Sequence, residues 1–125
     1  MSLEDAIRAP GNPDHFMRVK PAASRIVVRR GGAVLADSRA ALRVLEHGRD
    51  LYDPVLYIPL ADVTATLTPN GRTTHCPLKG DTVYYDGAAV PNLAWEYARP
   101  RPGAAMLRGN VAFDGASVTI CEGDA

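Results

Sequence analysis

The residues of this sequence best suited to chemistry fall in one short stretch, residues 72–81, which reads RTTHCPLKGD. Arg72 and Lys79 offer positive charge, Thr74 a hydroxyl group and Cys76 a thiol. A few converging polar groups beside an apolar wall are typical of small-molecule sites, so this set favours binding of a small polar or anionic molecule. The thiol also allows a second chemistry, nucleophilic attack through Cys76.

Which of these side chains lie close together depends on the strands predicted on either side of the Asn70-Gly71 turn. Asn70-Gly71 is a typical two-residue hairpin turn, so residues 63–68 are predicted to pair with the strand that follows. Because side chains alternate along a strand, Arg72, Thr74 and Cys76 then share the apolar face of this hairpin. An arginine on that face is costly unless it is paired or hydrated.

Two interpretations of this face remain open from the sequence. In the structural one, Arg72 pairs with a carboxylate such as Glu46 or Asp62, and Cys76 is a small core residue. In the functional one, these side chains line a pocket, with Lys79 and the turn at Gly80 forming its mouth.

Aromatic residues can supply the apolar wall of such a pocket. Trp95 and Tyr97 are two positions apart, so they share one face of a predicted strand at residues 93–98. Either Trp95 or Tyr57 suits the role of the wall. The complete set of predicted ligand-binding residues is Arg72, Thr74, Cys76, Lys79, Tyr57, Trp95, Glu46 and Asp62.

Other chemistries lack their usual spacing. His75 and Cys76 are adjacent on a predicted strand and therefore point apart, and neither Cys-x-x-Cys nor His-x-x-x-His occurs. The sequence therefore predicts no metal and no cofactor. It also has no glycine-rich phosphate loop and no Gly-x-Ser-x-Gly motif.

Length and composition limit the kind of protein. The chain has 125 residues, enough for one domain, with 14 basic and 14 acidic residues and no formal net charge. This balance argues against nucleic acid and anionic membrane surfaces as partners. Its only cysteines are Cys76 and Cys121, and we identify neither a signal peptide nor a membrane helix. We therefore expect a cytoplasmic protein with reduced thiols.

The turn-forming dipeptides along the chain predict a mainly β fold. Residues 1–22 are expected to form an N-terminal tail, and residues 23–125 a single β domain. Gly31-Gly32, Asn70-Gly71, Asp86-Gly87 and Asp114-Gly115 each separate two strand-like runs, which predicts a small β-tent or barrel of short antiparallel hairpins. One short helix is expected near residues 38–47, beginning at the N-cap Ser38.

Several motifs also resemble those of a known family. In chain order they are Ala36-Asp37-Ser38, Tyr57-x-Pro59-x-x-Asp62-Val63, residues 72–80, Ala94-Trp95-x-Tyr97-x-x-Pro100 and Gly109-x-Val111-Ala112-Phe113. Together they resemble the bacterial family known as domain of unknown function 427, over residues 25–121. The resemblance implies an Mss4-like β-tent or barrel without an established activity. The family motifs fall here on Tyr57, Asp62, Arg72, Thr74, Cys76, Lys79, Trp95 and Tyr97.

This resemblance does not imply a metal. Zinc-binding Mss4-like proteins typically carry two Cys-x-x-Cys pairs, and this sequence has none. Our leading hypothesis is therefore a binding module for a small polar or anionic molecule. The alternatives are an enzyme that uses Cys76, Glu46 or Asp62, and a protein-interaction domain without a pocket.

Overall fold

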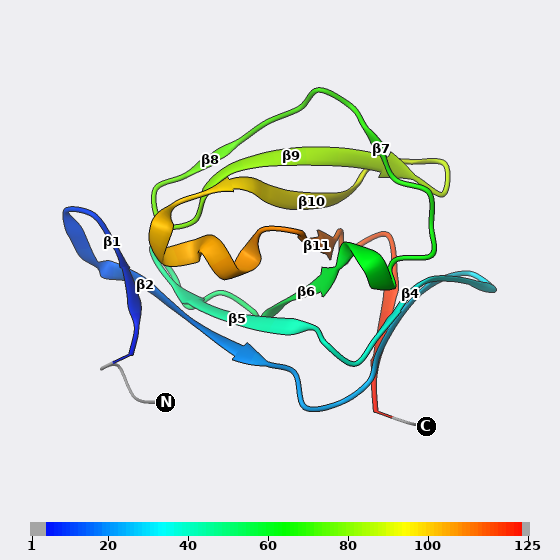
Figure 1. Ribbon diagram of the computed structural model, residues 1–125, viewed down its shortest axis with the longest axis horizontal. Helices are drawn as coiled ribbons and strands as arrows, with labels where there is room; N and C mark the ends of the chain where they lie inside the picture. Colours follow the sequence, from blue (N-terminus) through cyan, green and yellow to red (C-terminus); the bar gives the residue numbers. More distant parts are fainter. Residues whose placement is uncertain (1–4, 124–125) are drawn as a thin grey trace.

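The computed structural model describes residues 5–123 and is mainly β (Figure 1). Two short 3-10 helices interrupt the strands. The elements are β1 (Ile7–Ala9), β2 (Asn12–Pro21), β3 (Ile26–Arg30), β4 (Ala33–Ser38), β5 (Leu42–His47), β6 (Val55–Pro59), η1 (Leu60–Asp62), β7 (Thr68–Pro69), β8 (His75–Cys76), β9 (Gly80–Gly87), β10 (Val90–Pro100), η2 (Pro102–Leu107), β11 (Asn110–Phe113) and β12 (Thr119–Glu122).

The strands form two antiparallel sheets. The larger has nine strands in the order β1-β2-β5-β6-β11-β10-β9-β7, with β8 also pairing with β9. The smaller has three strands in the order β12-β3-β4. In Figure 1 the larger sheet runs from β2 and β5 at the bottom, through β6 and β11, to β9 and β10 at the top.

The larger sheet curls into a half-barrel. Three strands separate β5 from β9, so in a flat sheet they would lie about 19 Å apart, at about 4.8 Å per step. Yet Lys79, in the turn before β9, bonds with its ammonium group to the carboxylate of Glu46 in β5. Side chains alone do not cover that distance, so the sheet bends to bring these two strands together.

Both faces of the curled sheet are covered by apolar side chains. On the convex side, Ile26 and Val28 of β3 pack with Leu93, Val111 and Phe113 of the larger sheet. The concave side holds a second buried cluster, whose members come from β1, β2, β5, β6, β10, β11, η2 and the β8–β9 turn: Ala9, Met17, Val44, Tyr57, Leu78, Tyr97, Ala104, Leu107 and Ala112. This concave cluster includes Tyr57 and Tyr97, and Cys76 and Trp95 pack against it.

The helix expected near residues 38–47 is wrong, because residues 42–47 form strand β5. Ser38 does cap locally, since its Oγ accepts a hydrogen bond from the N–H of Ala40 at 3.0 Å. The chain then enters the sheet between β2 and β6, which supply backbone partners on both sides. Tertiary pairing therefore overrides the intrinsic helix preference of this alanine- and leucine-rich segment.

The expected N-terminal tail is also different where the structure describes it. Residues 7–9 and 12–21 form β1 and β2, and residues 16–21 of β2 pair with β5. The buried Met17 of β2 lies in the concave cluster. The absence of a regular apolar pattern concealed this strand, because its inner face also carries a polar residue, His15.

Two of the four predicted hairpins form. The Gly31-Gly32 loop joins β3 to β4 as expected. β9 and β10 also form a hairpin, but its loop is Ala88-Ala89, both with positive φ, rather than Asp86-Gly87. Residues 68–76 pair with β9 instead of with residues 63–68, and β12 pairs with β3 instead of β11. The first prediction fails because residues 72–76 pair with the strand that follows them, β9, and the second because β12 pairs with β3, which is distant in sequence.

Other expectations are confirmed. The strand predicted at residues 93–98 forms as part of β10. Cys76 and Cys121 are both free thiols, the first half-buried and the second exposed. Within residues 5–123, no helix has the length and apolar character needed to cross a membrane.

Candidate functional site

The predicted motif, residues 72–81, runs antiparallel to β9 and turns directly into it. The N–H of Tyr84 donates to the carbonyl of Arg72 at 3.2 Å, and the N–H of Thr82 donates to the carbonyl of Thr74 at 2.9 Å. Cys76 pairs with Gly80 at the end of this ladder. The predicted partner strand was wrong, but alternate side chains still share a face, so Arg72, Thr74 and Cys76 all point to the concave side of the sheet.

Arg72 lies at one end of this face, over an aromatic pair. Its guanidinium carbon is 4.4 Å from the ring centroid of Tyr84, a distance typical of a cation–π contact. The ring of Tyr84 lies 6.2 Å from that of Trp95, its neighbour across the β9–β10 ladder. These residues line a shallow hollow of about 360 Å³, hereafter the Arg72 hollow, together with Pro91, Asn92 and Asp114.

Thr74 has a structural role in this arrangement. Its hydroxyl oxygen lies 2.7 Å from that of Thr82, and its N–H donates to the same Thr82 oxygen at 2.8 Å. A weaker contact of 3.3 Å joins it to the hydroxyl of Tyr84. The hydroxyl group predicted to bind a ligand is thus engaged in fixing the motif to β9.

A buried ion pair occupies the other end of the face. The ammonium of Lys79 bonds to Oε1 of Glu46, and Nε2 of His15 lies 2.8 Å from Oε2 of the same carboxylate. The side chains of Lys79, Glu46 and His15 are only 10%, 14% and 16% exposed, respectively. Burial opposes ionisation of Glu46, but the hydrogen bonds from Lys79 and His15 outweigh it and keep the pKa of Glu46 below its usual value.

Two tyrosines connect the ion pair to the Arg72 hollow. The indole N–H of Trp95 donates to the hydroxyl of Tyr57 at 3.4 Å, and the Tyr57 and Tyr97 ring centroids are 6.2 Å apart. Lys79 lies 5.5 Å from the centroid of Tyr97. Burial raises the pKa of both tyrosines well above the ordinary value, so they remain neutral at physiological pH.

Cys76 completes the polar end of the face. A nitrogen of His15, a carboxylate oxygen of Glu46 and the sulfur of Cys76 all lie within 4.8 Å of one another. His15 was not among the predicted site residues. Its strand was not predicted. The signal that could have indicated it is the spacing of His15 and the apolar Met17, which are two positions apart and therefore share one face of a strand.

Asp62 lies apart from the other predicted residues. It belongs to η1, where its carboxylate accepts a hydrogen bond from the hydroxyl of Ser38 at 2.7 Å. In Figure 1, η1 is at the right, whereas the turn that carries Lys79 is at the left. Asp62 therefore ties η1 to β4. The structure brings together the remaining seven predicted residues along the concave face: Glu46, Tyr57, Arg72, Thr74, Cys76, Lys79 and Trp95.

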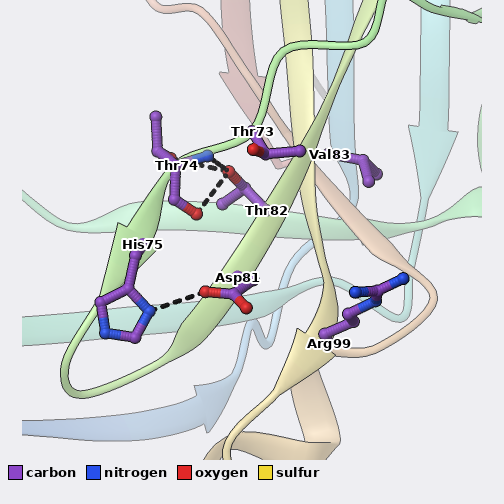
Figure 2. Close-up of a pocket in the computed structure, with 7 residues that line it drawn as sticks. All are labelled: Thr73, Thr74, His75, Asp81, Thr82, Val83 and Arg99. Carbon is purple, nitrogen blue, oxygen red and sulfur yellow. Dashed lines mark hydrogen bonds and ion pairs between the residues drawn. The ribbon is translucent and has the colours of Figure 1, made fainter.

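A second hollow, of about 460 Å³, lies beside the same hairpin and is lined by residues of the opposite face together with Thr74 and Thr82 (Figure 2). Its centre is Asp81, whose Oδ1 lies 2.6 Å from Nδ1 of His75, and Arg99 stands on the far side of Asp81. Thr73 and Val83 form the upper wall. His75 thus faces away from Cys76, as the strand alternation predicted.

These features define a class of small domain, a curled antiparallel sheet whose concave face joins a buried ion pair to an aromatic hollow. A family model described as Domain of unknown function (DUF427) matches residues 18–124. The chain belongs to this family. No curated protein matches the sequence.

Proposed function

We propose that this protein is a binding module for a small polar molecule with an anionic group, held in the Arg72 hollow. The observation that carries the proposal is the state of Arg72. Its side chain is exposed and stacked on Tyr84, and none of the ion pairs among residues 5–123 includes it. A guanidinium held flat in this way presents its N–H groups to a carboxylate or phosphate.

Charge distinguishes Arg72 from the other predicted cation. Lys79 is buried and its charge is matched by Glu46, so it offers little attraction to an incoming anion. Arg72 keeps its charge available at the rim of the same face. We therefore assign the anionic group of the ligand to Arg72 alone. The sequence had suggested that Arg72 and Lys79 would both contact it.

The remaining walls of the hollow indicate the rest of the ligand. Trp95 supplies a half-exposed aromatic surface, suited to stacking with a planar group. Asp114 lies on the same hollow, and its Oδ2 accepts a hydrogen bond from the hydroxyl of Ser117 at 2.7 Å. Its other lone pairs suit a donor group of the ligand. A volume of about 360 Å³ fits a small metabolite.

The test uses a reporter that the sequence provides. Trp95 is the single tryptophan of the chain and lines the Arg72 hollow, so a ligand bound there should change the intrinsic tryptophan fluorescence. The purified protein is titrated with benzoate, glutamate and nucleoside monophosphates, with uncharged benzamide as the neutral comparison. We expect at least one anion to shift the emission of Trp95, and benzamide to have no comparable effect.

A matched pair of variants tests the role of the charge. Arg72→Gln removes a charge-assisted contact worth about 1.5–3 kcal/mol, so the active anion should bind more than about tenfold more weakly. Arg99→Gln makes the same change in the second hollow and should leave binding unaltered. The proposal is wrong if no anion in the panel shifts the emission, or if both variants weaken binding equally.

A further inference from the structure

We infer that His15, Glu46 and Cys76 form a binding site for a zinc-class divalent ion at the polar end of the concave face. This site is separate from the Arg72 hollow and does not depend on a ligand binding there. Sequence spacing does not reveal this site, because residues 15, 46 and 76 are far apart in the chain. The three residues lie in three strands, β2, β5 and β8; β2 and β5 are neighbours, and the curl of the sheet brings Cys76 to them.

The donor atoms are close to the arrangement that zinc requires. A nitrogen, an oxygen and a sulfur atom lie within 4.8 Å of one another. Tetrahedral zinc sites have bonds of about 2.0–2.3 Å, which places their donor atoms about 3.3–3.8 Å apart. Side-chain rotations that move the donor atoms by about 1 Å would bring them from 4.8 Å to the separation that zinc requires. Three protein ligands leave a fourth position for water or a small anion, as in catalytic zinc sites.

Backbone pairing holds the strand positions of two of the ligands, Glu46 and Cys76. Met17 pairs with Glu46 across the β2–β5 ladder, so His15 and Glu46 lie diagonally on the same inner face. Cys76 is held by its pairing with Gly80 at the β8–β9 turn. All three side chains are half-buried.

Lys79 fits this site as a partner of the carboxylate. Its ammonium bonds to Oε1 of Glu46, while the contact with His15 is made by Oε2. An ion between His15 and Oε2 takes the place of the hydrogen bond that now joins them, and Lys79 continues to orient the carboxylate. The thiolate and carboxylate carry two negative charges and Lys79 one positive charge, so a divalent ion leaves the site positive. That excess favours an anionic fourth ligand.

The mixture of donors selects the kind of ion. Magnesium and calcium prefer sites made of oxygen ligands, whereas imidazole and thiolate favour zinc and its neighbours in the transition series. Cobalt(II) is therefore a suitable probe, since thiolate ligation gives it a charge-transfer absorption in the near ultraviolet. The metal-free protein, prepared by dialysis against a chelator with a phosphine reductant, is titrated with cobalt(II) chloride and then with zinc chloride.

We expect one cobalt ion per chain, a charge-transfer band and displacement of cobalt by zinc. Cys76→Ser should abolish the band, and His15→Asn should weaken cobalt binding by more than about tenfold. Cys121→Ser and His47→Asn are the matched controls, because Cys121 lies exposed on β12 and His47 contacts the backbone of Asp14. Both controls should bind cobalt as the unchanged protein does.

A second measurement needs no variant. Zinc should slow alkylation of Cys76 by iodoacetamide at least tenfold while leaving alkylation of Cys121 unchanged, as followed by peptide mass spectrometry. The inference is overturned if cobalt and zinc bind more weakly than about 100 µM, which is about −5.5 kcal/mol. It is also overturned if the band persists in Cys76→Ser, or if zinc protects both cysteines equally.

Discussion

Replacing Lys79 by methionine should strongly destabilise the metal-free protein. The side chains of Lys79 and Glu46 are 10% and 14% exposed, so removing the ammonium leaves a carboxylate with little access to water. Breaking a buried pair in this way costs about 3–5 kcal/mol. Because His15 remains as a partner of Glu46, we expect the lower end of that range, about 3 kcal/mol.

The double variant separates the ion pair from its surroundings. Glu46→Leu alone leaves a buried ammonium and should also cost about 3 kcal/mol. Lys79→Met combined with Glu46→Leu removes both charges from an apolar cluster, and should cost no more than either single change. The two substitutions should therefore be coupled by about 3 kcal/mol.

The assay is urea unfolding followed by circular dichroism, with a chelator present and the free energy extrapolated to water. Arg25→Met is the control on an exposed pair, since the side chains of Arg25 and Asp37 are both 38% exposed, and it should cost less than about 1 kcal/mol. Additive single losses, or single losses below about 1 kcal/mol, would refute the reasoning that this pair is buried and coupled.

Two further predictions concern β9. Gly80→Ala should cost about 3 kcal/mol or more in urea unfolding, because Gly80 has a φ of +117° and a Cβ there would lie 2.4 Å from a backbone carbonyl oxygen of β10; Gly71→Ala, at a φ of +85° with nothing within 4 Å, should cost about 1 kcal/mol. Burial and the hydrogen bond to Glu96 raise the pKa of Tyr85 to about 12 from 10.0, so its contribution to stability is complete below pH 10 and is lost as the pH rises toward 12. Tyr85→Phe should therefore flatten the fall in unfolding free energy between about pH 10 and 12, and an unchanged slope would contradict this.

The sequence predicted those features that depend on neighbours in the chain. The β3–β4 hairpin formed as expected because a Gly-Gly loop determines it locally. The shared face of Arg72, Thr74 and Cys76 survived a wrong partner strand, since side-chain alternation does not depend on which strand lies alongside. Trp95 and Tyr97 share a face for the same reason.

Features that depend on pairing between segments far apart in the chain could not be predicted from the local sequence. Nothing in the helix-favouring segment at residues 42–47 indicates that β2 and β6 will flank it. His15 joins the site only because β2 pairs with β5, and Glu46 meets Lys79 only because the sheet curls. Seven of the predicted residues therefore lie along the concave face, whereas Asp62 lies apart from them in η1, and His15, which was not predicted, lies among them.

The pairing of β12 with β3 has a consequence for how the protein folds during synthesis. β3 is made well before β12, yet they form one ladder, from Thr119 opposite Arg29 to Glu122 opposite Ile26. Until the ribosome has released residues 119–122, the β-branched run at residues 26–28 keeps one edge without backbone partners. Contacts between such distant segments also slow folding. The nascent chain therefore exposes an aggregation-prone strand edge until residues 119–122 have been made.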